Sequence, residues 1–251
     1  MTTSTDTLFV IESISKSYGP RNILRDLSFE IFRGECFVIM GRSGSGKSVT
    51  LRQLNGLEKP DAGRVVFDGT EISALEEHEL YETRRRIAML FQGGALFDSM
   101  TVFENIAFPM RQHTDYSDEQ IGRRVADRLS RVKLSAVEEK MPSALSGGMR
   151  KRVALARSLA LEPEVVLFDE PTTGLDPMTS ATIGHLIRRI QAKMGVTAIV
   201  VTHDLALARR VGDRIAFLED GHFSFQGNWE EADRTTNPLL AAFLAGREED
   251  E

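Results

Sequence analysis

The stretch "GRSGSGKS", residues 41–48, follows directly after the apolar run "CFVIM", residues 36–40. It fits the pattern G-x-x-x-x-G-K-[ST], which needs a strand before it and a helix beginning at its end. Glycines let backbone N–H groups surround phosphate oxygens, Lys47 can reach the β and γ phosphates, and the Ser48 hydroxyl can bind Mg²⁺. The stretch therefore predicts a phosphate-binding loop on an α/β fold. Its predicted contacts are Gly41, Arg42, Ser43, Gly44, Ser45, Gly46, Lys47, Ser48 and Val49.

Two later runs are short, apolar and end in polar residues: "VVLFDE", residues 165–170, and "TAIVVTHD", residues 197–204. Buried parallel strands with functional groups at their carboxyl ends have this pattern, and the helical segment between the two runs completes a strand–helix–strand unit. Adjacent carboxylates on a strand point to opposite faces. Asp169 therefore suits the Mg²⁺ shell, and Glu170 could polarise an attacking water as a general base.

Three further side chains are ambiguous on local grounds. Gln92 ends the strand-like run of residues 84–92, where a neutral amide could bind both a metal-bound water and a nucleotide. His203 ends the run of residues 197–204, and a lone histidine there is more often structural than functional. Tyr18 precedes a Gly-Pro turn and could stack on a base, although a surface tyrosine near a turn is equally typical.

A second candidate anion site lies in "LSGGMRKRVALAR", residues 145–157. Ser146, Gly147 and Gly148 precede an amphipathic basic run, so free N–H groups and the positive end of a helix dipole would coincide there. A chain that already holds a phosphate-binding loop does not need this second site for the same phosphate.

Composition limits the function classes. The 251 residues carry a formal net charge of -6 and are 41% apolar, which is typical of a soluble globular protein without a general attraction to nucleic acid. The one cysteine, Cys36, excludes a disulfide within the chain. No apolar run approaches the roughly 20 residues that cross a bilayer, so we expect a cytoplasmic chain whose membrane association comes through a partner.

The rest of the chain alternates between strand and helix signals. Ile121, Val125 and Leu129 follow helical spacing, and "FLEDGHFSF", residues 217–225, reads as a hairpin. Residues 237–246, "NPLLAAFLAG", predict a short helix with an apolar face. That face packs either on a neighbouring subunit or on its own chain.

Six elements in this order, "GRSGSGKS", Gln92, "LSGGM", "VVLFDEP", "GLDP" and "VTHD", resemble ATP-binding cassette (ABC) ATPases over almost the whole chain. The resemblance implies an α/β P-loop NTPase core with an antiparallel β subdomain and an inserted α-helical subdomain. It gives one domain over residues 1–246, the insert at about 93–157 and an acidic tail at 247–251. It further implies ATP and Mg²⁺ as cofactors, and ATP enclosed between two cassettes of a head-to-tail homodimer.

The resemblance also assigns roles to the candidate residues. It implies that Tyr18 stacks on adenine, that Gln92 senses the γ-phosphate and that His203 is a switch histidine. It implies catalytic roles for Lys47, Gln92, Glu170 and His203, and Mg²⁺ contacts for Ser48, Gln92 and Asp169. Ser146, Gly147, Gly148 and Asp176 would act on the nucleotide of the partner subunit.

A narrower resemblance rests on "FQGGALFDSMTVFENIAFPM", residues 91–110, and on Met149, where most of the family has Gln. Both are similar to the ATPases of Mla-type phospholipid-trafficking transporters that work with mammalian-cell-entry (MCE) proteins. This implies a membrane permease, an MCE-type lipid-binding protein, possible contact with a small accessory subunit, and a place on the inner face of the cell membrane. The apolar side chains Leu96, Phe97, Met100, Val102 and Phe103 would be divided between the permease surface and the core.

Other functions remain open on the sequence alone. The chain could energise a transporter for another substrate, or regulate a membrane complex such as a cell-wall enzyme. A cassette acting on nucleic acid is disfavoured, because the chain is compact and acidic and its Arg84, Arg85 and Arg86 are too few and too local for a nucleic-acid track.

Overall fold

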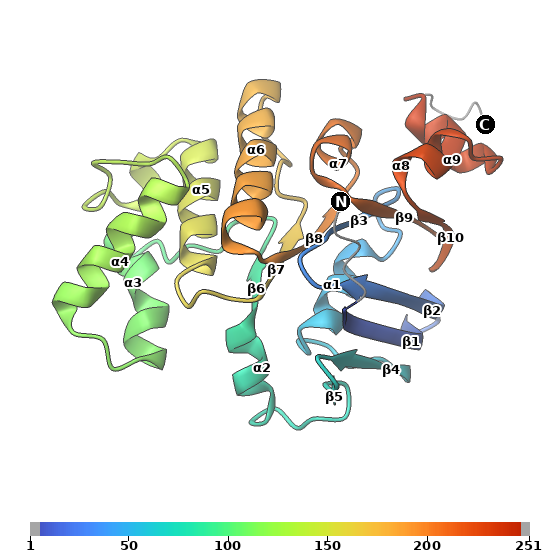
Figure 1. Ribbon diagram of the computed structural model, residues 1–251, viewed down its shortest axis with the longest axis horizontal. Coiled ribbons are helices and arrows are strands. Elements are labelled where there is room, and N and C mark those ends of the chain that lie inside the picture. The colour runs from blue at the N-terminus through green and yellow to red at the C-terminus, as the bar shows by residue number, and fades with distance from the viewer. Residues whose placement is uncertain (1–5, 247–251) are drawn as a thin grey trace.

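The first of two sheets is antiparallel and four-stranded. The structure, a computed structural model, describes residues 6–246. The strands of this sheet run in the order β2-β1-β4-β5 (Figure 1). Their bounds are Thr7–Tyr18 for β1, Arg21–Phe32 for β2, Ala62–Phe67 for β4 and Thr70–Glu71 for β5.

The second sheet has six strands in the order β10-β9-β3-β8-β7-β6, all parallel except the β9–β10 hairpin. Parallel strands must be joined by crossovers, and the helices between these strands supply them. The hairpin predicted at residues 217–225 is confirmed. The bounds are Cys36–Met40 for β3, Ile87–Leu90 for β6, Val165–Asp169 for β7, Thr197–Thr202 for β8, Arg214–Glu219 for β9 and His222–Gly227 for β10.

The parallel sheet is buried on both faces, which explains its continuous apolar runs. Along β3, Phe37 and Ile39 face a core shared with the antiparallel sheet and α1. Cys36, Val38 and Met40 face a second core shared with α6 and α7 (Figure 1). The bounds of these helices are Lys47–Leu54 for α1, Pro177–Met194 for α6 and Leu205–Val211 for α7.

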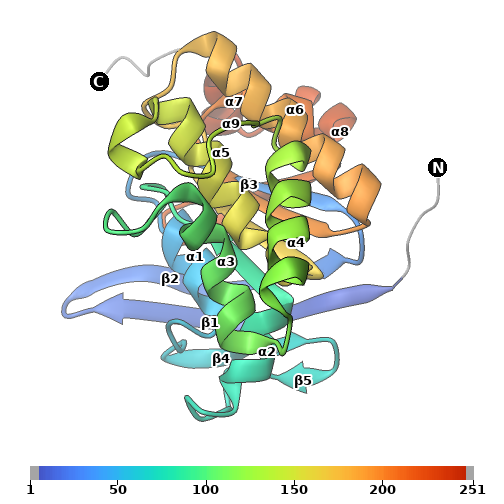
Figure 2. The ribbon, with the colours of Figure 1, turned by 90° about the vertical axis from the view of Figure 1, so that its left-hand side faces the viewer.

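Three helices between β6 and β7 form a unit that projects to one side of the sheets and comes to the front in Figure 2. They are α3 at Val102–His113, α4 at Asp118–Arg131 and α5 at Gly147–Ser158, with the short 3-10 turn η1 at Pro142–Ala144. Ile121, Val125 and Leu129 form the buried stripe of α4, as their spacing predicts. This unit agrees with the predicted fold class. The domain boundaries, with the insert at about 93–157, stay a prediction, and the acidic tail at 247–251 lies outside the described residues.

The C-terminal helix α9, Pro238–Leu244, follows α8 at Trp229–Asp233 and packs on its own chain. Leu240 is fully buried, and the Phe243 ring lies 5.2 Å from the Phe217 ring of β9. The apolar face predicted for this helix is partly covered by its own chain, because Leu239, Phe243 and Leu244 are half-buried; contact with a neighbouring subunit stays a prediction. No helix of residues 6–246 has the length and apolar character needed to cross a membrane.

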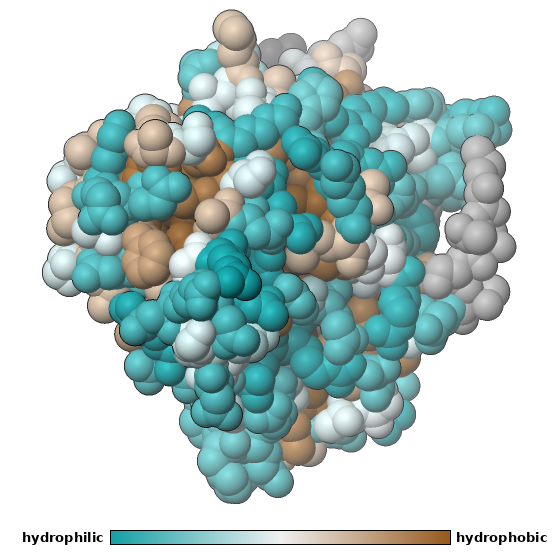
Figure 3. Space-filling view, turned by 60° about the vertical axis from the view of Figure 1, so that its left-hand side comes forward, coloured by the Kyte–Doolittle hydropathy of each residue, from teal (hydrophilic) through white to brown (hydrophobic). Residues whose placement is uncertain are grey.

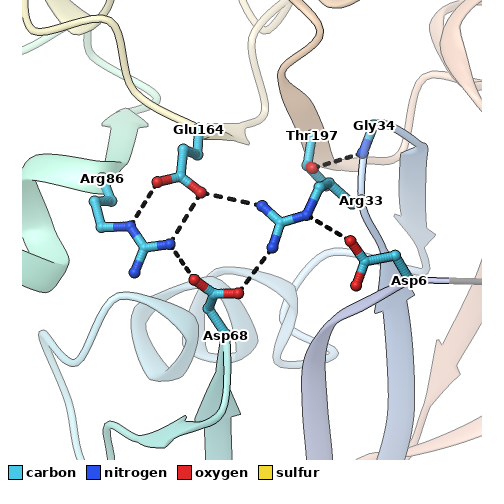
Figure 4. Close-up of polar contacts among 7 residues, drawn as sticks. All are labelled: Asp6, Arg33, Gly34, Asp68, Arg86, Glu164 and Thr197. Carbon is cyan, nitrogen blue, oxygen red and sulfur yellow. Dashed lines mark hydrogen bonds and ion pairs between the residues drawn. The ribbon is translucent and has the colours of Figure 1, made fainter.

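An ion-pair network joins the two sheets at the edge where the parallel strands begin (Figure 4). Arg33, after β2, contacts Asp68 at 2.8 Å, Glu164 at 3.1 Å and Asp6 at 2.9 Å. Arg86, the last residue of α2 (Leu80–Arg86), pairs with the same Glu164 at 2.6 Å and with Asp68. The polar residues that follow the strands lie at the opposite edge of the parallel sheet.

Candidate active site

Four neighbouring parallel strands bring the predicted site residues together. The strands β3, β8, β7 and β6 are adjacent and end at the same edge of the sheet. The loop of residues 41–48 follows β3, His203 follows β8, Glu170 follows β7, and Gln92 lies two residues after β6. In open α/β sheets, ligands bind beyond this carboxyl edge.

The loop of residues 41–48 is shaped for an anion. A Cβ at Gly41 would lie 2.4 Å from the Leu218 carbonyl oxygen, so only glycine fits there. Gly46, at φ 105°, begins α1, and no side chain caps the first N–H groups of that helix. The Ser45 hydroxyl is buried without a hydrogen-bond partner among the described residues. Open donors at a helix start are what a nucleotide phosphate needs.

Lys47 is held over this loop. Its side chain is 6% exposed, and its ammonium donates to the carbonyl oxygens of Gly41 at 2.8 Å and Arg42 at 2.9 Å. Burial lowers the Lys47 pKa, while the charge of Glu170, 3.5 Å away, acts in the opposite direction. A cation that is already partly desolvated interacts strongly with phosphate charge.

Asp169 and Glu170 both contact the site, contrary to the opposite faces predicted by strand alternation. Glu170 has a left-handed backbone, φ 45°, which is unusual for a residue other than glycine and is typical of functional positions. This turn brings its carboxylate within 2.9 Å of His203 Nδ1 and 3.5 Å of the Lys47 ammonium. The Ser48 hydroxyl donates to Asp169 at 2.6 Å.

The pairing of Ser48 with Asp169 suits Mg²⁺. A hydroxyl and a carboxylate oxygen lie side by side, and hard oxygen ligands are those that Mg²⁺ prefers. Within residues 6–246 there is no group of three or more His, Cys, Asp or Glu side chains placed to hold a metal. Mg²⁺ commonly binds through one or two protein oxygens together with substrate phosphates and waters, so Ser48 and Asp169 are the residues that could hold it.

Gln92 and Tyr18 are less constrained. Gln92 is exposed, and its backbone carbonyl accepts a hydrogen bond from the Lys151 ammonium. Tyr18, at the end of β1, is 45% exposed, and its hydroxyl donates to Glu58. The Tyr18 ring is open on this surface, but no described contact joins it to the loop of residues 41–48. Its contact with adenine stays a prediction.

The second predicted anion site begins α5. Ser146 caps this helix and accepts a hydrogen bond from the Met149 N–H at 3.3 Å. Asp176 caps α6 and accepts from the Thr179 hydroxyl at 2.6 Å. A Cβ at Gly148 would lie 2.4 Å from the Thr179 methyl group, so the two helix starts are in contact. No described hydrogen bond joins Ser146, Gly147, Gly148 or Asp176 to the loop of residues 41–48.

Sequence reasoning missed Lys151, which is 7% exposed and lies beside the site. The signal was its spacing, because Lys151 is three residues after Gly148 and four before Leu155, both buried on α5. A lysine on the buried face of a helix usually has a specific partner. It also missed Thr179, whose contacts join α6 to α5.

Comparison with known proteins agrees with this geometry. Residues 24–173 match the family model described as ABC transporter. The chain is 41% identical over 237 residues to the "Probable ribonucleotide transport ATP-binding protein mkl" of Mycobacterium leprae, covering 94% of this chain and 68% of that protein. It is 39% identical over 246 residues to the "Intermembrane phospholipid transport system ATP-binding protein MlaF" of Escherichia coli, covering 98% of this chain and 91% of that protein.

Solved structures show the same fold, and one of them contains nucleotide. The "Dimeric structure of a post-hydrolysis state of the ATP-binding cassette MJ0796 bound to ADP and Pi" superposes with a TM-score of 0.82 at 34% identity, over 88% of this chain and 98% of that one. The structure of cbiO1 from Clostridium perfringens, part of the ABC transporter complex cbiONQ, superposes with a TM-score of 0.84 at 30% identity, over 95% of each chain. The chain therefore belongs to the ABC transporter family, as an ATP-binding and ATP-hydrolysing cassette.

Proposed function

We propose that this cassette energises the movement of phospholipids through a membrane permease, working as a homodimer. The observation that carries the substrate is the 39% identity to the phospholipid transport protein of E. coli, which extends over 98% of this chain and 91% of that relative. The M. leprae relative has a different substrate in its name, but this chain covers only 68% of its length. The stretch of residues 91–110 supports the same choice.

The dimer is supported by the separation of two predicted nucleotide-binding regions within one chain. The loop of residues 41–48 leads into a helix start without a side-chain cap, and Ser146 caps the start of α5, yet no described hydrogen bond joins these two regions. In a head-to-tail pair, Ser146, Gly147 and Gly148 of one subunit would cover the ATP held by the loop of the other. Asp176 would lie in the same interface. The related cassette MJ0796 is dimeric in its solved structure.

The chemistry proposed is attack of water on the γ-phosphate. Lys47 binds the β and γ phosphates, Gln92 contacts the γ-phosphate, and Glu170 accepts a proton from the water as general base. His203 lies 2.9 Å from the Glu170 carboxylate, so it holds that carboxylate in place. We propose that it also orients the γ-phosphate. Mg²⁺ held by Ser48 and Asp169, with Gln92 nearby, would neutralise phosphate charge. Tyr18 would stack on adenine.

The permease is proposed to dock beside the three-helix unit. Figure 3 shows apolar atoms gathered in a hollowed area on this side of the molecule. Of the apolar side chains predicted for this surface, Val102 is fully buried and belongs to the core, whereas Phe97 is exposed and lies 5.1 Å from the exposed ring of Phe108. Such exposed apolar groups are typical of a protein interaction site. Docking there would place the chain on the inner face of the membrane.

Purification of the tagged chain from its native membranes tests the substrate. We expect a permease and an MCE-type lipid-binding protein to copurify, with or without a small accessory subunit, and phospholipid to be retained by the complex. Phe97→Asp should release the permease, whereas Tyr81→Asp, on the exposed side of α2, serves as the control. Recovery of a solute-binding protein that carries an amino acid or a metal ion would contradict the proposal.

A further inference from the structure

The contacts between α5 and the loop that carries Gln92 are not explained by the ATP site described above. The Lys151 ammonium donates to the Gln92 carbonyl oxygen. One turn later, the Ala154 methyl would lie 3.4 Å from a Cβ at Gly94. A further turn on, the Arg157 guanidinium donates to the Ala95 carbonyl oxygen at 2.8 Å. Residues three apart share one face of a helix, so one side of α5 holds this loop by hydrogen bonds from Lys151 and Arg157, and Ala154 lies between them, close to Gly94.

Burial of the Lys151 ammonium makes this contact less favourable in free energy than a contact from a neutral donor would be. Its side chain is nearly buried, and no carboxylate of residues 6–246 lies within ion-pair distance of it. A buried charge without a paired charge costs free energy that a neutral donor would not. Burial lowers the Lys151 pKa, and the charges of Asp169 and Glu170 partly offset that effect. The ammonium therefore lies in the field of the catalytic carboxylates while it holds the Gln92 backbone.

We propose that Lys151 is a positioning residue that links the two ATP sites of the dimer, by tying α5 to Gln92. The inference rests on the proposed head-to-tail dimer. In that dimer, the start of α5 contacts the ATP of the partner subunit, and Lys151 lies three residues after Gly148 on the same helix. The Lys151 ammonium binds the backbone of Gln92, and Gln92 serves the ATP of its own subunit. A shift of α5 at one site is thus passed to the backbone of Gln92 at the other.

Such a link has a measurable consequence. Coupling between two sites is reciprocal, and it makes ATP at one site favour the active arrangement at the other. Hydrolysis should then rise with ATP concentration with a Hill coefficient above about 1.5, toward the limit set by two sites. Without the Lys151 contact, ATP at one site of the dimer would no longer change the position of Gln92 at the other site, and the Hill coefficient should fall toward one.

The experiment measures hydrolysis against ATP concentration for the purified full chain and for variants of α5. Lys151→Met keeps the volume and removes the donor, and Lys151→Gln serves as a second neutral variant if the first does not fold. We expect both to lower the Hill coefficient to about one, while the affinity of isolated chains for ATP changes by less than about twofold. Lys151→Arg should retain cooperativity.

Arg123→Met is the matched control. Arg123 is an exposed basic residue of α4, and its guanidinium pairs with Glu119 of the same helix, away from Gln92. We expect this variant to keep the wild-type Hill coefficient. A Lys151→Met protein that loses thermal stability or maximal rate but keeps its cooperativity would show a merely structural role and overturn the inference.

The dimer is checked separately. Glu170→Gln with intact Lys151 should form an ATP-dependent dimer in gel filtration. If it stays monomeric, the proposed function fails, and the inference fails with it. If it dimerises and Lys151→Met leaves the Hill coefficient unchanged, only the inference fails.

Discussion

At the scale of single residues, the site depends on side chains with abnormal surroundings. Glu170 has a left-handed backbone, and Lys47 is buried against the carbonyl oxygens of its own loop. Strain and desolvation of this kind destabilise a fold and persist only where the surrounding structure imposes them. They are concentrated at functional positions. The contacts of Glu170 with His203 and Lys47 hold its carboxylate in one orientation, which the proposed proton transfer requires.

Glu170→Gln should lower the rate of ATP hydrolysis by about 10² to 10⁴-fold, the usual contribution of a general base. The glutamine keeps the shape of the side chain, so ATP binding should remain. Phosphate release and nucleotide binding, measured on the same protein, separate the two effects. Glu164→Gln, which changes a glutamate at the opposite end of β7, is the control and should hydrolyse ATP at nearly the wild-type rate. Wild-type turnover by Glu170→Gln would remove Glu170 from the mechanism.

At the scale of elements, the starts of α5 and α6 form one unit. Gly148 leaves room for the Thr179 methyl group, and the Thr179 hydroxyl binds Asp176. Any side chain at position 148 must push the two helix starts apart, because a Cβ there would lie 2.4 Å from that methyl group. The contact keeps the two regions proposed to cover the partner's ATP in a fixed relation.

Gly148→Ala should reduce hydrolysis strongly while isolated chains still bind ATP, because the loop of residues 41–48 is untouched. Overpacking of this kind costs roughly 1–3 kcal/mol. Thr179→Ser removes the obstructing methyl group and keeps the hydroxyl, so the double variant should recover most of the lost rate. Activity assays on the wild type and the three variants test this. If Thr179→Ser gives no rescue, the clash is not the cause of the loss.

At the same scale, the limits of sequence reasoning become clear. The apolar runs that form β3, β7 and β8 and the glycine pattern of residues 41–48 are local signals, and they correctly predicted the three strands and the loop that leads from β3 into α1. Nucleotide binding by that loop stays a prediction. The left-handed backbone of Glu170 and the hydrogen bond from Lys151 to Gln92 depend on contacts between distant segments, which local sequence patterns do not show. The roles assigned to Tyr18, Gln92 and Asp176 came from family resemblance and stay predictions.

At the scale of the whole molecule, the ion-pair network of Arg33 and Arg86 joins the sheets at the edge opposite the site (Figure 4). The Arg86 guanidinium lowers the pKa of both Glu164 and Asp68. Because these folded pKa values lie below the unfolded ones, the network stabilises the fold above about pH 4.5 and loses that effect as pH falls through the lowered values.

The double variant Glu164→Gln, Asp68→Asn should therefore be less stable than the wild type at pH 7, by roughly 1 kcal/mol, since the groups are partly exposed. This difference should shrink as the pH falls below about 4, and also at high salt. Urea unfolding at several pH values measures it. Glu119→Gln, which removes a surface pair within α4, should show almost no change. A constant difference at all pH values would rule out this origin.

The account as a whole depends on a nucleotide site completed by two subunits. The most direct measurement is the mass of Glu170→Gln in ATP and Mg²⁺ by analytical ultracentrifugation, alone and combined with Ser146→Arg. We predict a dimer for the single variant, and an ATP-bound monomer for the double variant, because the arginine occupies the space where the partner's nucleotide would lie. A monomer in the first case, or an unchanged dimer in the second, would contradict the account.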